Sequence, residues 1–240
     1  MMARPADDAA VMRELVAAES AFREAIRRRP VWYHTYNELR VVYEWTAGRL
    51  GRKEERFAAL SASMHAAQIA AWLAPELTHK GLLEARNAFA QALIAGNDRK
   101  SNEAALGLMQ EAVVVADSLV QREPDDPDYR FSLAEAKCGM GMVRRNLGVG
   151  GWENAIRSGL IDVQRAATLA PDRIKFRTKQ ASWRQYLGEE LAKSEGEKER
   201  ARAEFALALQ GYEEAARLDP KNAEAQEGIR EVRALMGGGR

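Results

Sequence analysis

Apolar residues recur along most of this chain at intervals of three and four, the spacing that places them on one face of a helix. With glycine and proline as stops, the pattern predicts helices at residues 8–28, 32–48, 53–72, 76–95, 102–121, 127–147, 152–169, 173–194, 197–217 and 222–235. Valine-rich stretches such as Val113–Val115 lack the alternation of a strand. The longest irregular connection is expected at Ala95–Ser101, with Ser101 or Asn102 capping the helix that follows. The pattern therefore predicts an all-α protein.

Five of the seven prolines divide the chain almost evenly. They are Pro30, Pro75, Pro124, Pro171 and Pro220, separated by 45, 49, 47 and 49 residues. Because proline stops a helix, and because a fixed period of this size is typical of stacked helix pairs, the series indicates a repeat architecture. We expect one repeat domain over residues 1–240: a partial repeat at 1–30, repeats at 31–75, 76–124, 125–171 and 172–220, and a capping helix and tail at 221–240.

The repeats also match one another in detail. A shift of 47 residues superimposes Pro124 on Pro171 and Met140-Gly141 on Leu187-Gly188. Glycine inside a helix costs about 0.5–1 kcal/mol relative to alanine. Its recurrence at one repeat position predicts that a neighbouring helix packs too closely for a side chain at Gly141 and Gly188.

Residues at fixed spacings resemble the tetratricopeptide repeat family. Ala208, Tyr212, Ala215 and Pro220 have the family's spacing, Ala18, Phe22, Ala25 and Pro30 repeat it, and Tyr36, Leu39 and Tyr43 fit the next first helix, with Arg40 replacing a small residue. The units are longer than the usual family period of about 34 residues, and phrases such as EPDDPDYRFSLAEA are similar to long repeats of large bacterial signalling proteins. The resemblance implies a right-handed α-α superhelix of about ten antiparallel helices that supplies a binding surface.

The composition excludes several classes of protein. With 30% charged residues and a formal net charge of +1, the chain lacks the electrostatic field of a dedicated nucleic-acid binder. A single cysteine, Cys138, excludes an internal disulfide. The N-terminal segment has no apolar signal-peptide core, and no stretch of 18 apolar residues would span a membrane. We therefore expect a soluble, cytoplasmic protein.

Candidate catalytic chemistry is sparse. Gly139 and Gly141 follow helix and lack the lysine of a phosphate-binding loop, so they indicate helix packing. His34, His65 and His79 occur in separate helices without the spacing of metal ligands. We expect no enzyme activity, no cofactor and no metal.

Aromatic residues concentrate in the helix expected at 32–48. Tyr36, Leu39 and Tyr43 share one face and are expected to pack against the helix at 53–72. Trp32 and Trp45 do not belong cleanly to that face. They indicate either an interface with the N-terminal helix or an aromatic site for a partner's apolar side chain, since exposed tryptophan is typical of binding hot spots.

A second candidate binding surface is a basic stripe on two neighbouring repeats. It consists of Arg130, Lys137 and Arg144, spaced by seven, with Arg177 and Arg184 at the first two equivalent positions of the next repeat. Arginine can pair bidentately with carboxylates, so the stripe predicts binding of an acidic segment. The alternative is that these charges are simply solvated helix faces.

The favoured function is a non-catalytic scaffold or adaptor that binds a partner peptide or helix in a concave groove lined mainly by the first helix of each pair. One alternative is an assembly subunit that acts through homo-oligomerisation. An RNA- or DNA-binding helical repeat is a third possibility that the near-neutral charge disfavours.

Overall fold

The evenly spaced prolines lie where helices end or begin. Pro30, Pro124, Pro171 and Pro220 lie in turns after a helix, whereas Pro75 is the first residue of one. The computed structural model describes residues 5–96 and 98–237. Its helices are α1 (Pro5–Arg28), α2 (Tyr33–Ala47), α3 (Lys53–Leu73), α4 (Pro75–Gly96), α5 (Arg99–Arg122), α6 (Pro127–Asn146), α7 (Trp152–Leu169), α8 (Ile174–Ala192), α9 (Lys198–Leu218) and α10 (Ala223–Gly237), with a short 3-10 helix at Glu195–Glu197. These ranges contain no strand, so the predicted all-α class is confirmed.

Aspartate side chains cap two of the helices. Asp126 accepts hydrogen bonds from the backbone N–H groups of Asp128 (2.7 Å) and Tyr129 (3.0 Å), immediately before α6. Asp98 accepts from the N–H of Ser101 at 2.8 Å, and α5 begins at Arg99. The expected cap at Ser101 or Asn102 is therefore wrong, because an aspartate three residues earlier satisfies the free N–H groups. Asn97, within the expected connection, lies outside the described residues.

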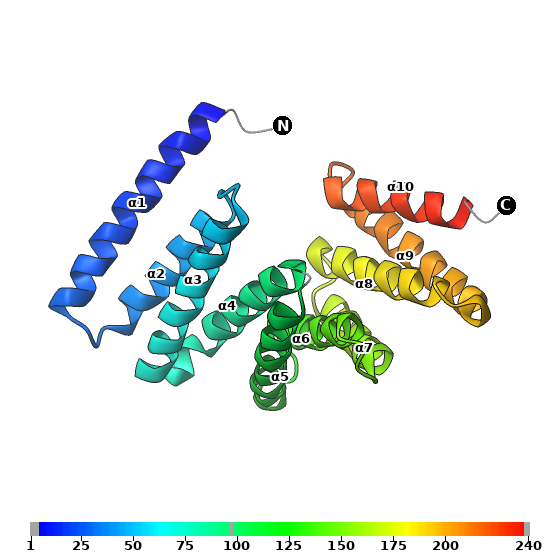
Figure 1. Ribbon diagram of the computed structural model, residues 1–240, viewed down its shortest axis with the longest axis horizontal. Coiled ribbons are helices and arrows are strands. Elements are labelled where there is room, and N and C mark those ends of the chain that lie inside the picture. The colour runs from blue at the N-terminus through cyan, green and yellow to red at the C-terminus, as the bar shows by residue number, and fades with distance from the viewer. Residues whose placement is uncertain (1–4, 97, 238–240) are drawn as a thin grey trace. The chain divides into compact units, whose positions relative to one another are not determined.

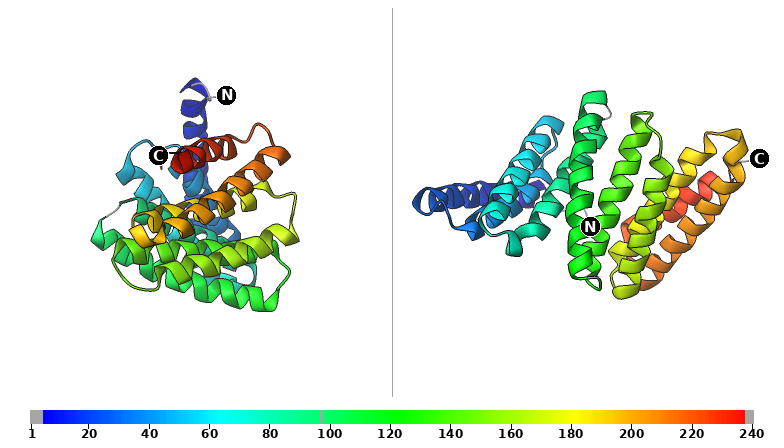
Figure 2. Two further views of the ribbon diagram at one scale, coloured as in Figure 1. Left: turned by 90° about the vertical axis from the view of Figure 1, so that its right-hand side faces the viewer. Right: turned by 90° about the horizontal axis from the view of Figure 1, so that it is seen from below.

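The chain divides into two compact units, Met1–Val115 (unit 1) and Ala116–Arg240 (unit 2), and the boundary falls within α5. In unit 1, α1 packs on α2, α2 on α3 and α3 on α4 (Figure 1). In unit 2, α6 lies beside α7 and α8 beside α9, and α10 packs on α9 (Figure 2). Packing between successive helices is the arrangement of an α-helical solenoid. The assignment of all 240 residues to a single repeat domain stays a prediction.

The helix pairs of unit 2 approach closely at glycine. A Cβ atom on Gly141 would lie 2.5 Å from Cγ1 of Ile156 and 2.8 Å from the carbonyl oxygen of Trp152. A Cβ on Gly188 would lie 2.7 Å from Cε1 of Phe205. The predicted close approach at both glycines is confirmed. The turn between α6 and α7 also uses glycine, since Gly151 has a φ of 79°.

The core of unit 1 has a charged centre. Arg40, buried on α2, donates from Nη1 to Glu44 at 2.7 Å and lies 3.5 Å from Glu84 of α4. Gly81 of α4 leaves room for this side chain, because a Cβ there would lie 3.1 Å from Nε of Arg40. A paired, buried arginine thus occupies the position where the sequence departs from the repeat pattern.

Candidate functional site

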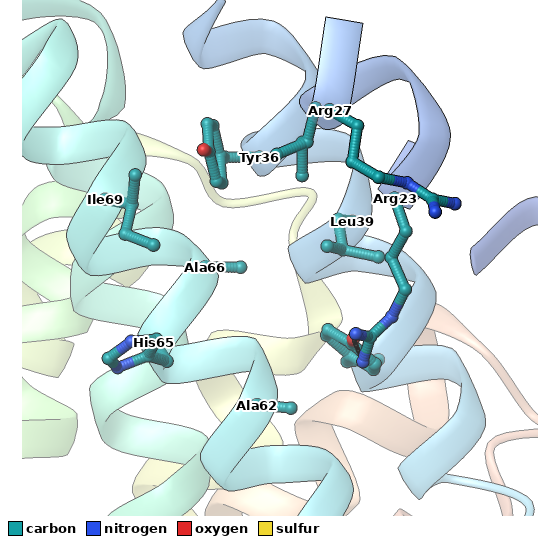
Figure 3. A pocket seen from close by; sticks show the side chains of 10 residues that line it. Arg23, Arg27, Tyr36, Leu39, Ala62, His65, Ala66 and Ile69 are labelled. Carbon is teal, nitrogen blue, oxygen red and sulfur yellow. Dashed lines mark hydrogen bonds between the residues drawn. The ribbon is translucent and has the colours of Figure 1, made fainter. Parts of the chain in front are cut away.

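An open groove in unit 1 has α2 as its floor and α1 and α3 as its walls (Figure 3). Its volume is about 620 Å³. The residues that line it are Arg23, Ile26 and Arg27 of α1, Tyr36, Leu39 and Tyr43 of α2, and Ala62, His65, Ala66 and Ile69 of α3. Most of the wall is apolar, and its charged lining residues are arginines, with no carboxylate among the ten. We call this feature the α1–α3 groove.

The depth of the groove comes from small residues on α3. Ala62 and Ala66 lie one turn apart and point toward Leu39 and the arginines of α1 (Figure 3). Tyr36, Leu39 and Tyr43 share a face of α2 that meets α3, as the sequence predicts. Leu39 and Tyr43 are buried, but Tyr36 remains half-exposed and is available to a ligand.

A polar cluster closes one end of the groove. Arg23 donates from Nη2 to the hydroxyl of Tyr43 at 2.8 Å, and that hydroxyl donates to Glu19 at 3.1 Å. Arg23 also bonds Glu19 directly, at 2.9 Å from Nε. Burial, together with the nearby Glu19 carboxylate, raises the pKa of Tyr43 above its ordinary value. The phenol therefore stays neutral and holds α1 against α2.

The opposite end of the groove carries exposed apolar side chains. Tyr36 and Ile69 line the groove together, and the chain beyond them carries large apolar residues just before α2 and in the last turn of α3. These are Trp32, which is 48% exposed, and Trp72, which is 81% exposed; Val31 next to Trp32 is 75% exposed. Such exposure is costly for tryptophan and is typical of a surface that a partner covers.

The two tryptophans singled out by the sequence have different surroundings. Trp32 packs edge-on against His34, and the Arg29 guanidinium lies 5.9 Å from its ring centroid. Trp45 is 56% exposed near the other end of α2, with the Arg49 guanidinium 5.4 Å from its ring. Neither lines the groove.

Trp72 was not among the residues predicted from the sequence, although its spacing from His65 and Ile69 places it on the same face of α3.

The structure places the basic stripe at helix–helix contacts of unit 2. Lys137 donates to Asp162 of α7 at 2.7 Å, and Arg130 lies 3.9 Å from the same carboxylate. Arg177 pairs with Glu214 at 3.2 Å, and Arg184 with Glu204 at 3.0 Å. Arg144 is half-buried beside Gly151. Four of the five cations therefore have acidic partners within the chain, which gives them a structural role; their binding of an outside partner stays a prediction.

The first residue of the stripe in each repeat also holds the proline turn. Arg130 donates from Nε to the carbonyl of Pro124 at 2.7 Å, and Arg177 approaches the carbonyl of Pro171 at 3.5 Å. Gln226 makes the equivalent 3.5 Å contact with Pro220. In all three cases the side chain lies six residues after the proline. These contacts satisfy carbonyls left open where a helix ends.

The α1–α3 groove and the basic stripe occupy the same repeat positions. Tyr36 lies six residues after Pro30, and Arg177 lies six residues after Pro171. Seven residues further along the chain, Tyr43 in unit 1 corresponds to Arg184 in unit 2. Opposite Tyr36 stands Ile69, six residues before Pro75, whereas Glu214 stands six residues before Pro220. The surface that is an open apolar groove in unit 1 is thus occupied by ion pairs in unit 2.

The remaining reactive groups form no assembled centre in the described part of the chain. Cys138 is fully buried, and burial raises the pKa of its thiol well above the ordinary value. Across residues 5–96 and 98–237, no group of three His, Cys, Asp or Glu side chains is placed to hold a metal ion. None of the helices described combines the length and apolar character needed to cross a bilayer.

Comparison with known proteins shows little about the chain. No family model and no curated protein matches its sequence. Among solved structures, a de novo designed helical repeat protein matches with 16% sequence identity and a TM-score of 0.28, over 97% of this chain and 94% of that one. At so low a TM-score, fold and site rest on the chain's own geometry.

Proposed function

We propose that this chain is a non-catalytic interaction module that holds a segment of a partner protein in the α1–α3 groove. The observation that carries the proposal is the open apolar groove at repeat positions that unit 2 fills with ion pairs. A groove of this size takes about two or three large side chains, and the arginines of its wall and the tyrosines of its floor are residue types typical of binding hot spots. Tyr36 and Ile69 would contact the partner directly.

The proposal gives the chain the role that its resemblance to tetratricopeptide repeats implies. The groove is nevertheless built differently from the surface expected from the sequence. Its floor is α2, the first helix of a pair, but both walls are second helices, α1 and α3. The partner would therefore lie between two successive second helices.

The contacts within unit 2 argue against the nucleic-acid alternative. A nucleic-acid surface needs cations that are free to neutralise phosphates. Lys137, Arg177 and Arg184 each have a carboxylate at 2.7–3.2 Å. Self-assembly remains an outcome of the test below.

The test is a selection of displayed peptides on the full chain, followed by measurement of the affinity of the selected peptides for the wild type and for Tyr36→Arg/Ile69→Glu. This variant installs the side chains that unit 2 carries at the same repeat positions, Arg177 and Glu214, so the two new charges can pair. We expect peptides that bind the wild type and bind the variant at least about tenfold more weakly. The matched control is Val114→Arg/Ile161→Glu, which places the same charges at exposed apolar positions that do not line the groove.

Circular dichroism of both variants checks that they fold. Selected peptides that bind wild type and groove variant equally would contradict the proposal. So would a selection that yields no groove-dependent peptide while light scattering shows that the chain self-associates and that the groove variant does not. The latter result would assign the groove to assembly.

A further inference from the structure

Positive charge is concentrated at one end of the α1–α3 groove. The last turn of α1 and the residue after it supply Arg27, Arg28 and Arg29. Arg27 and Arg28 share one carboxylate, Glu24, at 2.9 and 3.0 Å, and both are largely exposed. Arg29 stacks near the exposed ring of Trp32. Three cations with one acid leave this end short of negative charge.

The opposite wall supplies no compensating acid. From Arg56 to Leu73, α3 contains no Asp or Glu, and the ten residues that line the groove contain none either. At the other end of the groove, by contrast, Arg23 is paired with Glu19. The groove is therefore apolar along its length, balanced at one end and electropositive at the other. A partner that complements this pattern is apolar on one face and acidic at one end.

The length of the groove fits a helix. Ala62 and Ile69 are seven residues apart on α3, which corresponds to about 10 Å at 1.5 Å per residue. A helix presents side chains at i, i+3 or i+4, and i+7 over the same distance. Trp72 and Trp32 extend the apolar surface by a further turn at the electropositive end.

We infer that the α1–α3 groove takes an acidic amphipathic helix of a partner protein. Its apolar face lies over Tyr36, Leu39 and Ala66, and its carboxylates lie beside Arg27 and Arg28. Acidic residues are most favourable in the first turn of a helix, because they complement the helix dipole. The bound helix therefore has its N-terminal turn near Trp32 and Trp72. The inference rests on the proposed function and specifies its ligand.

The experiment uses three synthetic peptides of about 14 residues, roughly four turns, in fluorescence anisotropy with the full chain. The first carries leucines on one helical face and three acidic residues in its first turn. The second has lysines in place of the acids, and the third has the acids and a central proline. We expect the acidic peptide to bind about tenfold more tightly than the lysine peptide, and proline to abolish binding.

Two protein variants test whether the charges of Arg27 and Arg28 decide which peptide is preferred. Arg27→Glu/Arg28→Glu should reverse the preference between the acidic and lysine peptides. Arg202→Glu/Arg230→Glu, which changes two exposed arginines on α9 and α10, should leave the preference unchanged. The expected preference should also weaken as salt is added.

Equal affinity for the acidic and lysine peptides overturns the acidic ligand, and undiminished binding of the proline peptide overturns the helical one. Absence of binding by all three peptides overturns the inference as a whole. Each of these results leaves the proposed function to the peptide selection, since groove-dependent peptides of another kind would still support it. Loss of groove dependence in that selection would remove both.

Discussion

The face formed by α1, α2 and α3 in unit 1 and the face formed by α7, α8 and α9 in unit 2 differ at matching repeat positions. Tyr36 faces Ile69 across an open groove, whereas Arg177 pairs with Glu214 at 3.2 Å. Ala62 leaves space on α3, where α9 carries Leu207 at the same distance from its proline. One fold therefore produces either an open apolar surface or an ion-paired one, depending on the side chains at these facing positions.

A second difference concerns how closely the helices approach. The position seventeen residues after the repeat proline shows this difference. It is Ala47 in α2, but Gly141 in α6 and Gly188 in α8. The pairs in unit 2 leave no room for even a Cβ atom at this position. Tight pairing in unit 2 and an open groove in unit 1 are consistent with the proposal that unit 1 holds the partner segment.

The largest expected effect is at the close contact of unit 2. Gly141→Leu would push a side chain into Ile156 and the Trp152 carbonyl, so it should lower the free energy of unfolding by about 3 kcal/mol, the upper end of the range for overpacking. Urea denaturation measures the change. The control is Gly107→Leu on the exposed face of α5, where no atom lies within 4 Å of the added Cβ. A neutral Gly141 variant would mean that the pairs of unit 2 are no tighter than α2 and α3.

Next in size is the charge network across α7, α8 and α9. Glu204, with a side chain only 7% exposed, accepts from Arg157 at 2.9 Å and Arg184 at 3.0 Å. Glu204→Ala leaves both arginines without this acceptor and should cost about 2 kcal/mol in thermal or urea denaturation. Glu199→Ala, at an exposed pair on the same helix, should change stability by less than about 0.5 kcal/mol. Similar effects of the two substitutions would show that the unit 2 network is only a surface feature.

A smaller effect should appear at alkaline pH. Burial raises the pKa of Tyr212 to about 12, while its hydroxyl donates to Gln185 at 3.2 Å. The phenol ionises near pH 10 in the unfolded chain but later in the folded one, so the folded state loses stability as pH rises from about 10 to 12. At pH 11 the resulting loss in the free energy of unfolding is about 1 kcal/mol. Urea denaturation should show that the wild type has a lower free energy of unfolding at pH 11 than at pH 9, and that Tyr212→Phe reduces this difference. Equal differences in the wild type and the variant would contradict the prediction.

The smallest stability change is expected from exchanging the groove residues in reverse. Arg177→Tyr/Glu214→Ile places the pair from unit 1 in unit 2 and should cost no more than about 1 kcal/mol, because both side chains of this ion pair remain partly exposed and such pairs contribute little. It should nevertheless expose apolar surface and increase the fluorescence of anilinonaphthalene sulfonate relative to wild type. Unchanged fluorescence with an intact fold would show that the facing pair does not decide whether this surface is open.

The sequence determined the helices of this protein to within a few residues. Periodic apolar positions, glycines and prolines act locally, so ten segments and their boundaries could be predicted without knowing what they pack against. Local signals failed at the start of α5, where Asp98 rather than Ser101 or Asn102 caps the helix. The recurrence of Gly141 and Gly188 also revealed a tertiary contact, because only close packing explains a glycine repeated inside helices.

Only the tertiary structure decided which surface is open. The sequence showed Arg130, Lys137, Arg177 and Arg184 as a basic stripe, but not the carboxylates on neighbouring helices that neutralise them. It showed Tyr36 without Ile69, and it gave no sign that Trp72 is exposed. A helix face is set by residues three or four apart, whereas a groove is set by residues from different helices. Its shape and charge therefore appear only once those helices are packed together.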